Sequence, residues 1–130
     1  MSEVLQDAFG LQVSRSGWYQ SDQKLSNMAR PVYAELLEMI RQCSVVHADE
    51  TGWRIGTLAA WLWVFTNSAA TVYTIRANRS SDVVVDVLGQ EFKGILASDC
   101  FLAYDEKRLS AWLKQKCLSH LLKDLKEMKE

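Results

Sequence analysis

Three closely spaced apolar runs constrain the fold of this chain more than any other feature of its sequence. Residues 45–49 form a short apolar run that ends in an acid, and residues 59–66 and 71–76 are rich in β-branched and aromatic side chains, which favour strands. Gly56 lies in the first short connection, within a turn expected over residues 54–57, and Asn67 lies in the second. Strands joined by connections this short pair with one another, so we expect a three-stranded antiparallel meander.

After the meander the sequence alternates between helical and strand patterns. A helix is predicted to begin at Ser80 or Ser81 and to end at Gly89, and residues 94–99 form a predicted buried strand. Three further elements are expected, namely a helix over residues 101–112, a short strand over 115–118 and an amphipathic helix from Ser119, with Leu121, Leu122, Leu125 and Met128 inward. Three antiparallel strands, a crossover helix and further strands predict an α/β fold with a mixed sheet.

Residues 1–43 are predicted to form an N-terminal helical segment. A short helix that ends at Gly10 and a second one capped by Ser14 predict a helical hairpin. A long amphipathic helix over residues 24–42 follows, with Pro31 in its first turn or at a kink. The predicted domains are therefore residues 1–43 and residues 44–130.

The overall charge argues against a protein that is basic throughout. Fifteen Lys and Arg residues against sixteen Asp and Glu residues give a net charge of −1, whereas residues 107–130 alone carry seven basic and three acidic side chains. No apolar run is long enough to span a bilayer, and the first residues lack the features of a secretion leader. With three unclustered cysteines, we expect a cytoplasmic protein with no membrane partner.

Two aspartates follow predicted buried strands and mark the candidate site. Asp49 follows the first strand and Asp99 follows the strand over 94–99, fifty positions later. If these strands are neighbours, both carboxylates emerge at one edge of the sheet, where their mutual repulsion favours a bound cation. Mg²⁺ prefers such oxygen ligands, and paired Mg²⁺ ions promote phosphodiester cleavage. The alternative is that each aspartate forms a turn or caps a helix.

Two neighbours of Asp49 have less specific patterns. His47 lies two positions earlier, on the same face of the strand. It could order a metal-bound water or a phosphate there, or it could be a hydrogen-bonded structural histidine. Glu50 points to the opposite face, so we expect it to be solvated or to contact the metal ligands without binding the metal itself.

Trp61 and Trp63 share one face of the second predicted strand. They are expected to be core residues, with a base-stacking platform as the alternative.

Several short sequence words occur in an order that is typical of one protein family. The words are HADETGWR (47–54), WLWVF (61–65), YTIR (73–76) with Arg79, SDC (98–100), AYD (103–105) and CLSHLLKDL (117–125). Together they closely resemble the catalytic region of bacterial transposases of the insertion-sequence-sixty-six type, which belong to the DDE class. The resemblance extends over essentially the whole chain.

This resemblance implies a ribonuclease-H-like core with an Asp, Asp, Glu triad that holds Mg²⁺ or Mn²⁺. Asp49 matches the first catalytic, metal-ligating acid and Asp99 the second. In such proteins the third acid lies well downstream of the C-x-x-H-L word, so Glu127 and Glu130 are not expected to supply it. The resemblance therefore implies an incomplete core and a truncated transposase.

The implied function is metal-dependent DNA cleavage and strand transfer during DNA transposition. Its implied partners are transposon ends, target DNA, and a second copy or other transposase subunits. The alternative is a non-catalytic remnant that acts only as a DNA-binding or subunit-binding module. Five basic side chains are predicted to contact DNA phosphates, with solvated side chains as the alternative: Arg54, Arg76, Arg79, Lys114 and Lys116.

Overall fold

The computed structural model describes residues 2–128, and residues 2, 3 and 124 by their backbone only. Its internal contacts divide the chain into two compact units, Met1–Ala34 and Glu35–Glu130. The predicted division into residues 1–43 and 44–130 stays a prediction. Within residues 2–128, no helix combines the length and the apolar character that a membrane span requires.

The first unit is helical. Helix α1 covers Ser2–Phe9, and α2 covers Arg15–Arg41, so that α2 begins in the first unit and ends in the second. The N–H of Gly17 donates to Oγ of Ser14 at 3.1 Å, which confirms Ser14 as the cap.

The predicted helical hairpin is wrong, because one continuous helix of 27 residues replaces its second helix and the expected long helix. No glycine or proline separates the two expected helices, so nothing in the local sequence interrupts the backbone hydrogen bonds between them. Pro31 lies inside this helix and not in its first turn.

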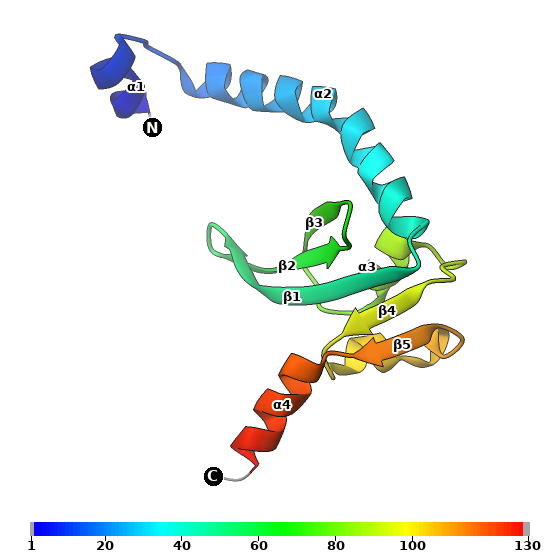
Figure 1. Cartoon of the computed structure of the whole chain (residues 1–130). Coiled ribbons are helices and arrows are strands. Elements are labelled where there is room, and N and C mark those ends of the chain that lie inside the picture. Colours follow the sequence, from blue (N-terminus) through cyan, green and yellow to red (C-terminus); the bar gives the residue numbers. More distant parts are fainter. Residues whose placement is uncertain (1, 129–130) are drawn as a thin grey trace. The chain divides into compact units, whose positions relative to one another are not determined.

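The second unit is built on a five-stranded sheet of order β3-β2-β1-β4-β5 (Figure 1). Its strands are β1 (Val45–Ile55), β2 (Leu58–Thr66), β3 (Thr71–Arg76), β4 (Ile95–Ser98) and β5 (Leu113–Lys116). Strands β1, β2 and β3 pair antiparallel, whereas β4 is parallel to both β1 and β5. This mixed sheet, with a crossover helix between β3 and β4, confirms the predicted α/β fold of three antiparallel strands followed by a crossover helix and further strands.

Strand β1 is longer than its apolar pattern predicts. It continues through Ile55 and turns at Gly56, whose φ of +61° suits a residue without a side chain. Residues 50–55 are mostly exposed and carry no apolar alternation, but they pair with β2 as far as Ile55 and Leu58. Pairing with β2 thus extends β1 through residues whose side chains are not buried. As a result, Asp49 lies inside β1 and not at its end.

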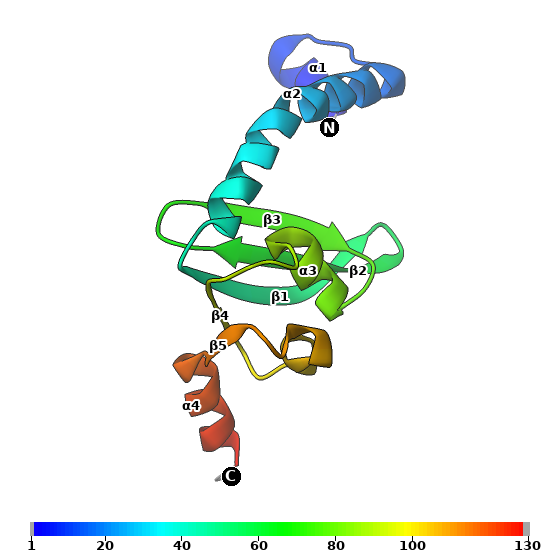
Figure 2. The same ribbon diagram turned by 90° about the vertical axis from the view of Figure 1, so that its right-hand side faces the viewer.

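The core lies on one face of the sheet. Helix α3 (Ser81–Leu88) and the short 3₁₀ helices η1 (Leu102–Asp105) and η2 (Lys107–Leu109) cover this face (Figure 2). The core residues contributed by the sheet, α3 and the 3₁₀ segment include Val46, Trp63, Phe65, Val72, Val84, Leu88, Leu96 and Tyr104, each at most 2% exposed. Trp63 is fully buried and Trp61 packs against this core, as the core interpretation of these tryptophans predicts.

The chain after β4 differs from its predicted elements. The expected helix over 101–112 is wrong, because an extended Glu106 (φ −56°, ψ 147°) separates η1 from η2. Strand β5 begins and ends two residues earlier than predicted, at Leu113 and Lys116.

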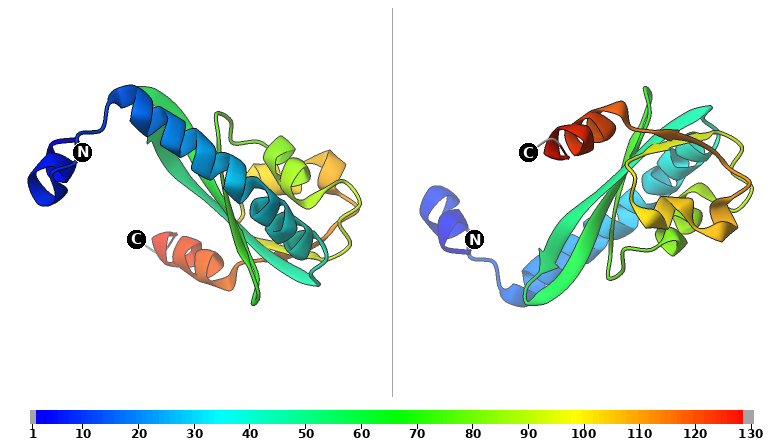
Figure 3. Two further views of the ribbon diagram at one scale, coloured as in Figure 1. Left: turned by 90° about the horizontal axis from the view of Figure 1, so that it is seen from above. Right: turned by 90° about the horizontal axis from the view of Figure 1, so that it is seen from below.

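Helix α4 (Leu118–Glu127) lies on the opposite face of the sheet from α3 (Figure 3). Three of the side chains that were expected inward are instead exposed, with exposed fractions of 58% for Leu122, 55% for Leu125 and 81% for Met128. Amphipathic periodicity predicts the helix correctly, but it does not specify which neighbour covers the apolar face.

Gly94 is required where the chain enters β4. A Cβ atom at this position would clash with the carbonyl oxygen of Cys43 and would lie 2.6 Å from the Phe92 ring. We expect Gly94→Ala to lower the free energy of unfolding by about 1–3 kcal/mol, the usual cost of overpacking. Gly52→Ala is the matched control, because a Cβ there has no neighbour within 4 Å. Urea denaturation of both variants measures the difference, and equal stability would contradict the steric argument.

Candidate functional site

The parallel pairing of β1 with β4 brings the two predicted metal-ligating aspartates to equivalent positions. Val45 pairs with Ile95 and His47 pairs with Ala97, a constant offset of fifty residues. Asp49 and Asp99 differ by the same fifty positions and follow the last pair by two residues. Side chains two residues apart share a face of the sheet, so both aspartates lie on the face of His47.

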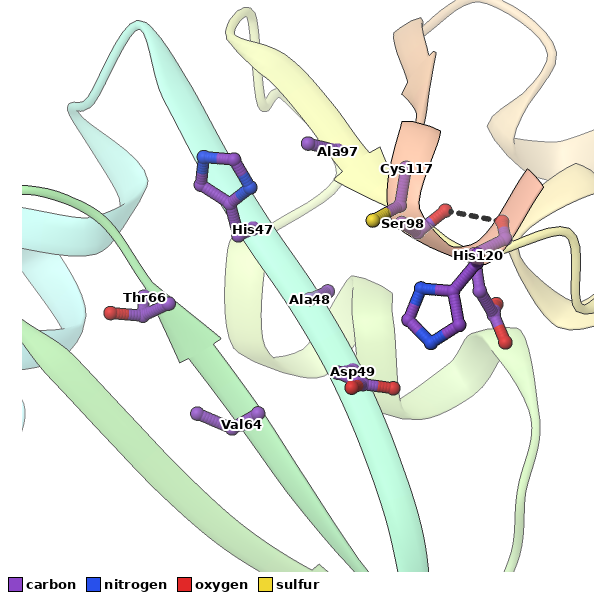
Figure 4. Close-up of a pocket in the computed structure, with 10 residues that line it drawn as sticks. His47, Ala48, Asp49, Val64, Thr66, Ala97, Ser98, Cys117 and His120 are labelled. Atoms are coloured by element: carbon purple, nitrogen blue, oxygen red, sulfur yellow. Dashed lines mark hydrogen bonds between the residues drawn. The ribbon is translucent and has the colours of Figure 1, made fainter. Parts of the chain in front are cut away.

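Both carboxylates line one pocket of about 280 Å³ on the face opposite the core. Strand β2 contributes Val64 and Thr66 to its walls, and the start of α4 contributes His120, preceded by Cys117. Figure 4 shows the imidazole of His120 beside the carboxylate of Asp49. His47 also lines the pocket, so the structure places the HAD and C-x-x-H words together.

Each aspartate has one carboxylate oxygen that is held by the backbone. Oδ1 of Asp49 accepts the N–H of Glu50 at 2.9 Å, and Oδ1 of Asp99 accepts the N–H of Phe101 at 2.9 Å. Within residues 2–128 no hydrogen bond or ion pair engages the other oxygen of either carboxylate. Two oriented carboxylates with uncommitted oxygens form a donor set that suits Mg²⁺ or Mn²⁺. Across the part of the chain that the structure describes, however, no three His, Cys, Asp or Glu side chains form a preformed metal cluster.

His120 and Cys117 shift each other's pKa at the rim of this pocket. Hydrogen bonds from the His120 backbone and side chain lower the pKa of the Cys117 thiol. The hydrogen bond with Cys117 raises the pKa of His120, and the negative charges of Asp49 and Asp99 raise it further. Each of these two shifts favours the charged form of its group.

Glu50 occupies the other face of β1 and is not solvated. Its side chain is 0% exposed, and Arg79 contacts Oε1 through Nη2 at 2.6 Å and Nε at 2.8 Å. The hydroxyl of Tyr104 donates to Oε2. Burial raises the pKa of the Glu50 carboxyl, although Tyr104 and Arg79 oppose this shift. The same burial and the neighbouring Glu50 raise the pKa of the Tyr104 phenol.

The predicted DNA contacts differ in their surroundings. Arg54 and Arg76 are exposed and have no side-chain partner among the described residues. Arg79 is engaged by Glu50, and its guanidinium lies 3.6 Å from the ring centroid of Phe101. Lys114 and Lys116 both approach Asp105, at 3.7 Å and 2.6 Å respectively.

Sequence reasoning assigned no role to Tyr104 or Asp105, although both lie in the AYD word. Tyr104 supports Glu50, and Asp105 pairs with the two lysines of β5. The sequence did contain one signal for such a role. Glu50 lies next to Asp49 on the core face of the strand, and a buried carboxylate requires a partner from elsewhere in the chain. Glu127 lies 3.9 Å from Lys123 on exposed α4, whereas Glu130 lies outside the described residues.

The ion pair between Lys116 and Asp105 predicts a measurable pH effect. The hydrogen bond from Lys116 holds the pKa of Asp105 below its ordinary value. A depressed carboxyl pKa contributes stability above the ordinary aspartate range, and this contribution is lost as the pH falls through the depressed pKa. We expect Lys116→Gln to raise the pKa of Asp105, as followed by NMR titration of its carboxyl carbon. Asp82, whose pKa is lowered by Ser80 and Arg108, is the internal control and should not change.

Among the solved structures that match this chain, two illustrate how limited the likeness is. An intasome of simian T-cell lymphotropic virus, in complex with a PP2A regulatory subunit, has 13% identity and a TM-score of 0.48 over 56% of this chain and 31% of that chain. The HTLV-2 integrase catalytic core domain in complex with magnesium has 12% identity and a TM-score of 0.44 over 64% of this chain and 66% of that chain. The matched region thus covers about a third and about two thirds of these two chains.

Comparison with protein families identifies the chain more specifically than comparison with solved structures does. No curated protein shows significant similarity to the sequence. The profile of the Transposase IS66 family matches residues 1–130, and this match includes the words that surround Asp49, Asp99 and His120. The chain belongs to the Transposase IS66 family.

Proposed function

We propose that this chain carries two metal-ligating acids of a DDE-type transposase catalytic domain, Asp49 and Asp99. The observation that supports this proposal is their shared pocket, which the β1–β4 register creates. Each aspartate retains one uncommitted oxygen for Mg²⁺ or Mn²⁺. When bound, such an ion supplies charge stabilisation for phosphodiester cleavage and strand transfer.

The chain's own residues prepare this pocket for a phosphate group. The N–H groups of Glu50 and Phe101 orient the two carboxylates, so little rearrangement is needed on binding. The raised pKa of His120 favours its cationic form, which would donate a hydrogen bond to an anionic phosphate oxygen. Transposon ends and target DNA are the substrates that fit this role in a bacterial cytoplasm, with a second copy or other transposase subunits as partners.

Metal binding tests the proposal directly. Titration of the full chain with Mn²⁺ should broaden the NMR signals of residues 48–50 and 98–100 at the lowest metal concentrations. Substitution of residues that only contact the ligands of a metal site already weakens metal binding by about ten-fold or more. Loss of a ligand should weaken it at least as much, so we expect Asp49→Asn and Asp99→Asn each to raise the Kd for Mn²⁺ by at least about ten-fold.

Asp86→Asn serves as the matched control, because Asp86 is an exposed aspartate of α3 away from the pocket. It should leave the Mn²⁺ affinity unchanged. Broadening that is centred elsewhere, or that persists in both pocket variants, would refute a metal site at Asp49 and Asp99.

A second candidate function is a non-catalytic module that binds DNA or a transposase subunit. The pocket supports this alternative, because Asp49 and Asp99 are its only acidic residues among residues 2–128, whereas a DDE site uses three carboxylates. The exposed arginines Arg54 and Arg76 are free to contact phosphates. Such contacts position DNA without reading its sequence.

Salt dependence distinguishes phosphate contacts from solvated arginines. Arg76→Gln should weaken binding to duplex DNA of any sequence and should reduce the slope of log K against log salt by about 1, the value for one lost phosphate contact. Fluorescence anisotropy over a salt series measures this slope. Arg30→Gln, which replaces an exposed arginine of α2, should leave the slope unchanged. Identical slopes for the wild-type chain and Arg76→Gln would mean that Arg76 is merely solvated.

A further inference from the structure

A buried ionic cluster lies directly behind the pocket, on the core face of β1. It consists of Glu50, Arg79 and Tyr104, which come from β1, the β3–α3 connection and η1. The side chain of Glu50 is fully buried, and both of its carboxylate oxygens are engaged. Burial of a charged pair contributes little net stability compared with apolar side chains of similar size, so stability alone does not account for this cluster.

The cluster reaches Asp49 through the backbone of Glu50. The Glu50 N–H donates to Oδ1 of Asp49, while the Glu50 side chain is held by Arg79 and Tyr104 on the opposite face. Any rotation of this peptide would move the Asp49 hydrogen bond and the buried carboxylate together. The orientation of Asp49 therefore depends on the anchoring of Glu50.

The cluster reaches Asp99 through Phe101. The Phe101 N–H donates to Oδ1 of Asp99, and the Phe101 ring packs under the Arg79 guanidinium and edge-on to Tyr104, with centroids 6.4 Å apart. Arg79 also lies 4.7 Å from the ring centroid of Trp61, which restricts its movement further. A planar guanidinium that is both paired and stacked is a rigid link.

We propose that Glu50, Arg79 and Tyr104 form a clamp that fixes the Asp49 and Asp99 carboxylates relative to each other for divalent-ion binding. This inference rests on the proposed function, because the clamp is useful only if the two acids share a ligand. Glu50, Arg79 and Tyr104 are positioning residues, since none of them lines the pocket. Each acts through an N–H group that holds one of the acids.

The test uses Tyr104→Phe in the full chain. This variant removes one hydroxyl but keeps the ring that packs against Trp63 and Phe101. We expect the Kd for Mn²⁺ to rise about ten-fold, as for other outer partners of metal ligands. The amide proton of Phe101 should also exchange faster in the metal-free protein, because its hydrogen bond to Asp99 is less well held.

Two further variants separate positioning from general destabilisation. Arg79→Lys keeps the positive charge beside Glu50 but loses the planar stack on Phe101, so it should reproduce both effects. Asp82→Asn breaks the exposed ion pair with Arg108, which has the same 2.6 Å distance as the buried pair, and should change neither readout.

The two readouts distinguish failure of the clamp from failure of the metal site. If the wild-type chain binds Mn²⁺ and both clamp variants bind it equally well, the clamp is refuted. If the wild-type chain does not bind Mn²⁺ at this pocket, the proposed function is refuted, and Phe101 exchange alone decides whether the cluster orients Asp99. Unchanged Phe101 exchange in both variants would refute the clamp in either case.

Discussion

The parallel pairing of β1 with β4 covers three residue pairs, yet the arrangement of the candidate site depends on it. A one-residue shift in this register would move Asp99 to the opposite face from Asp49 and would also exchange buried Leu96 for half-buried Ile95. The apolar side chains of Val46 and Leu96 pair on the core face and oppose such a shift. The packing that stabilises the sheet therefore also aligns the two acids.

Side chains alternate between the two faces of β1, so the pocket residues and the core residues of this strand lie on opposite faces. His47 and Asp49 face the pocket, whereas Val46 and Glu50 face the core. Because Glu50 continues the core face beyond the last apolar residue, its charge requires a partner, which Arg79 supplies. The exposed face is thus free to carry acids for function, while the buried face determines where those acids point.

The sequence predicted the strands and α3 because each depends on local pattern, namely apolar runs and a serine at the start of a helix. It also placed Asp49 and Asp99 after two of those runs, whereas the constant offset of fifty became visible only in the β1–β4 register. It did not predict the end of β1, since residues 50–55 are extended by pairing with β2. The expected helix over 101–112 failed for a related reason, because Tyr104 and Leu109 are both buried in the core on either side of the extended Glu106. The contacts of Tyr104 with Glu50 join residues 54 positions apart, which no local pattern records.

The distribution of charge around the pocket bears on the proposed cation site. Burial raises the pKa of Glu50 and the charge of Asp99 adds to this shift, while Cys117 raises the pKa of His120 and the charges of Asp49 and Asp99 add to that one. Arg79 pairs with Glu50 on the core face, and Lys116 reaches only the backbone oxygen of Asp99 while its charge pairs with Asp105. Under the proposed function, a divalent ion would balance the two pocket carboxylates, and the oxygens that the Glu50 and Phe101 amides leave uncommitted are the ones available to hold it.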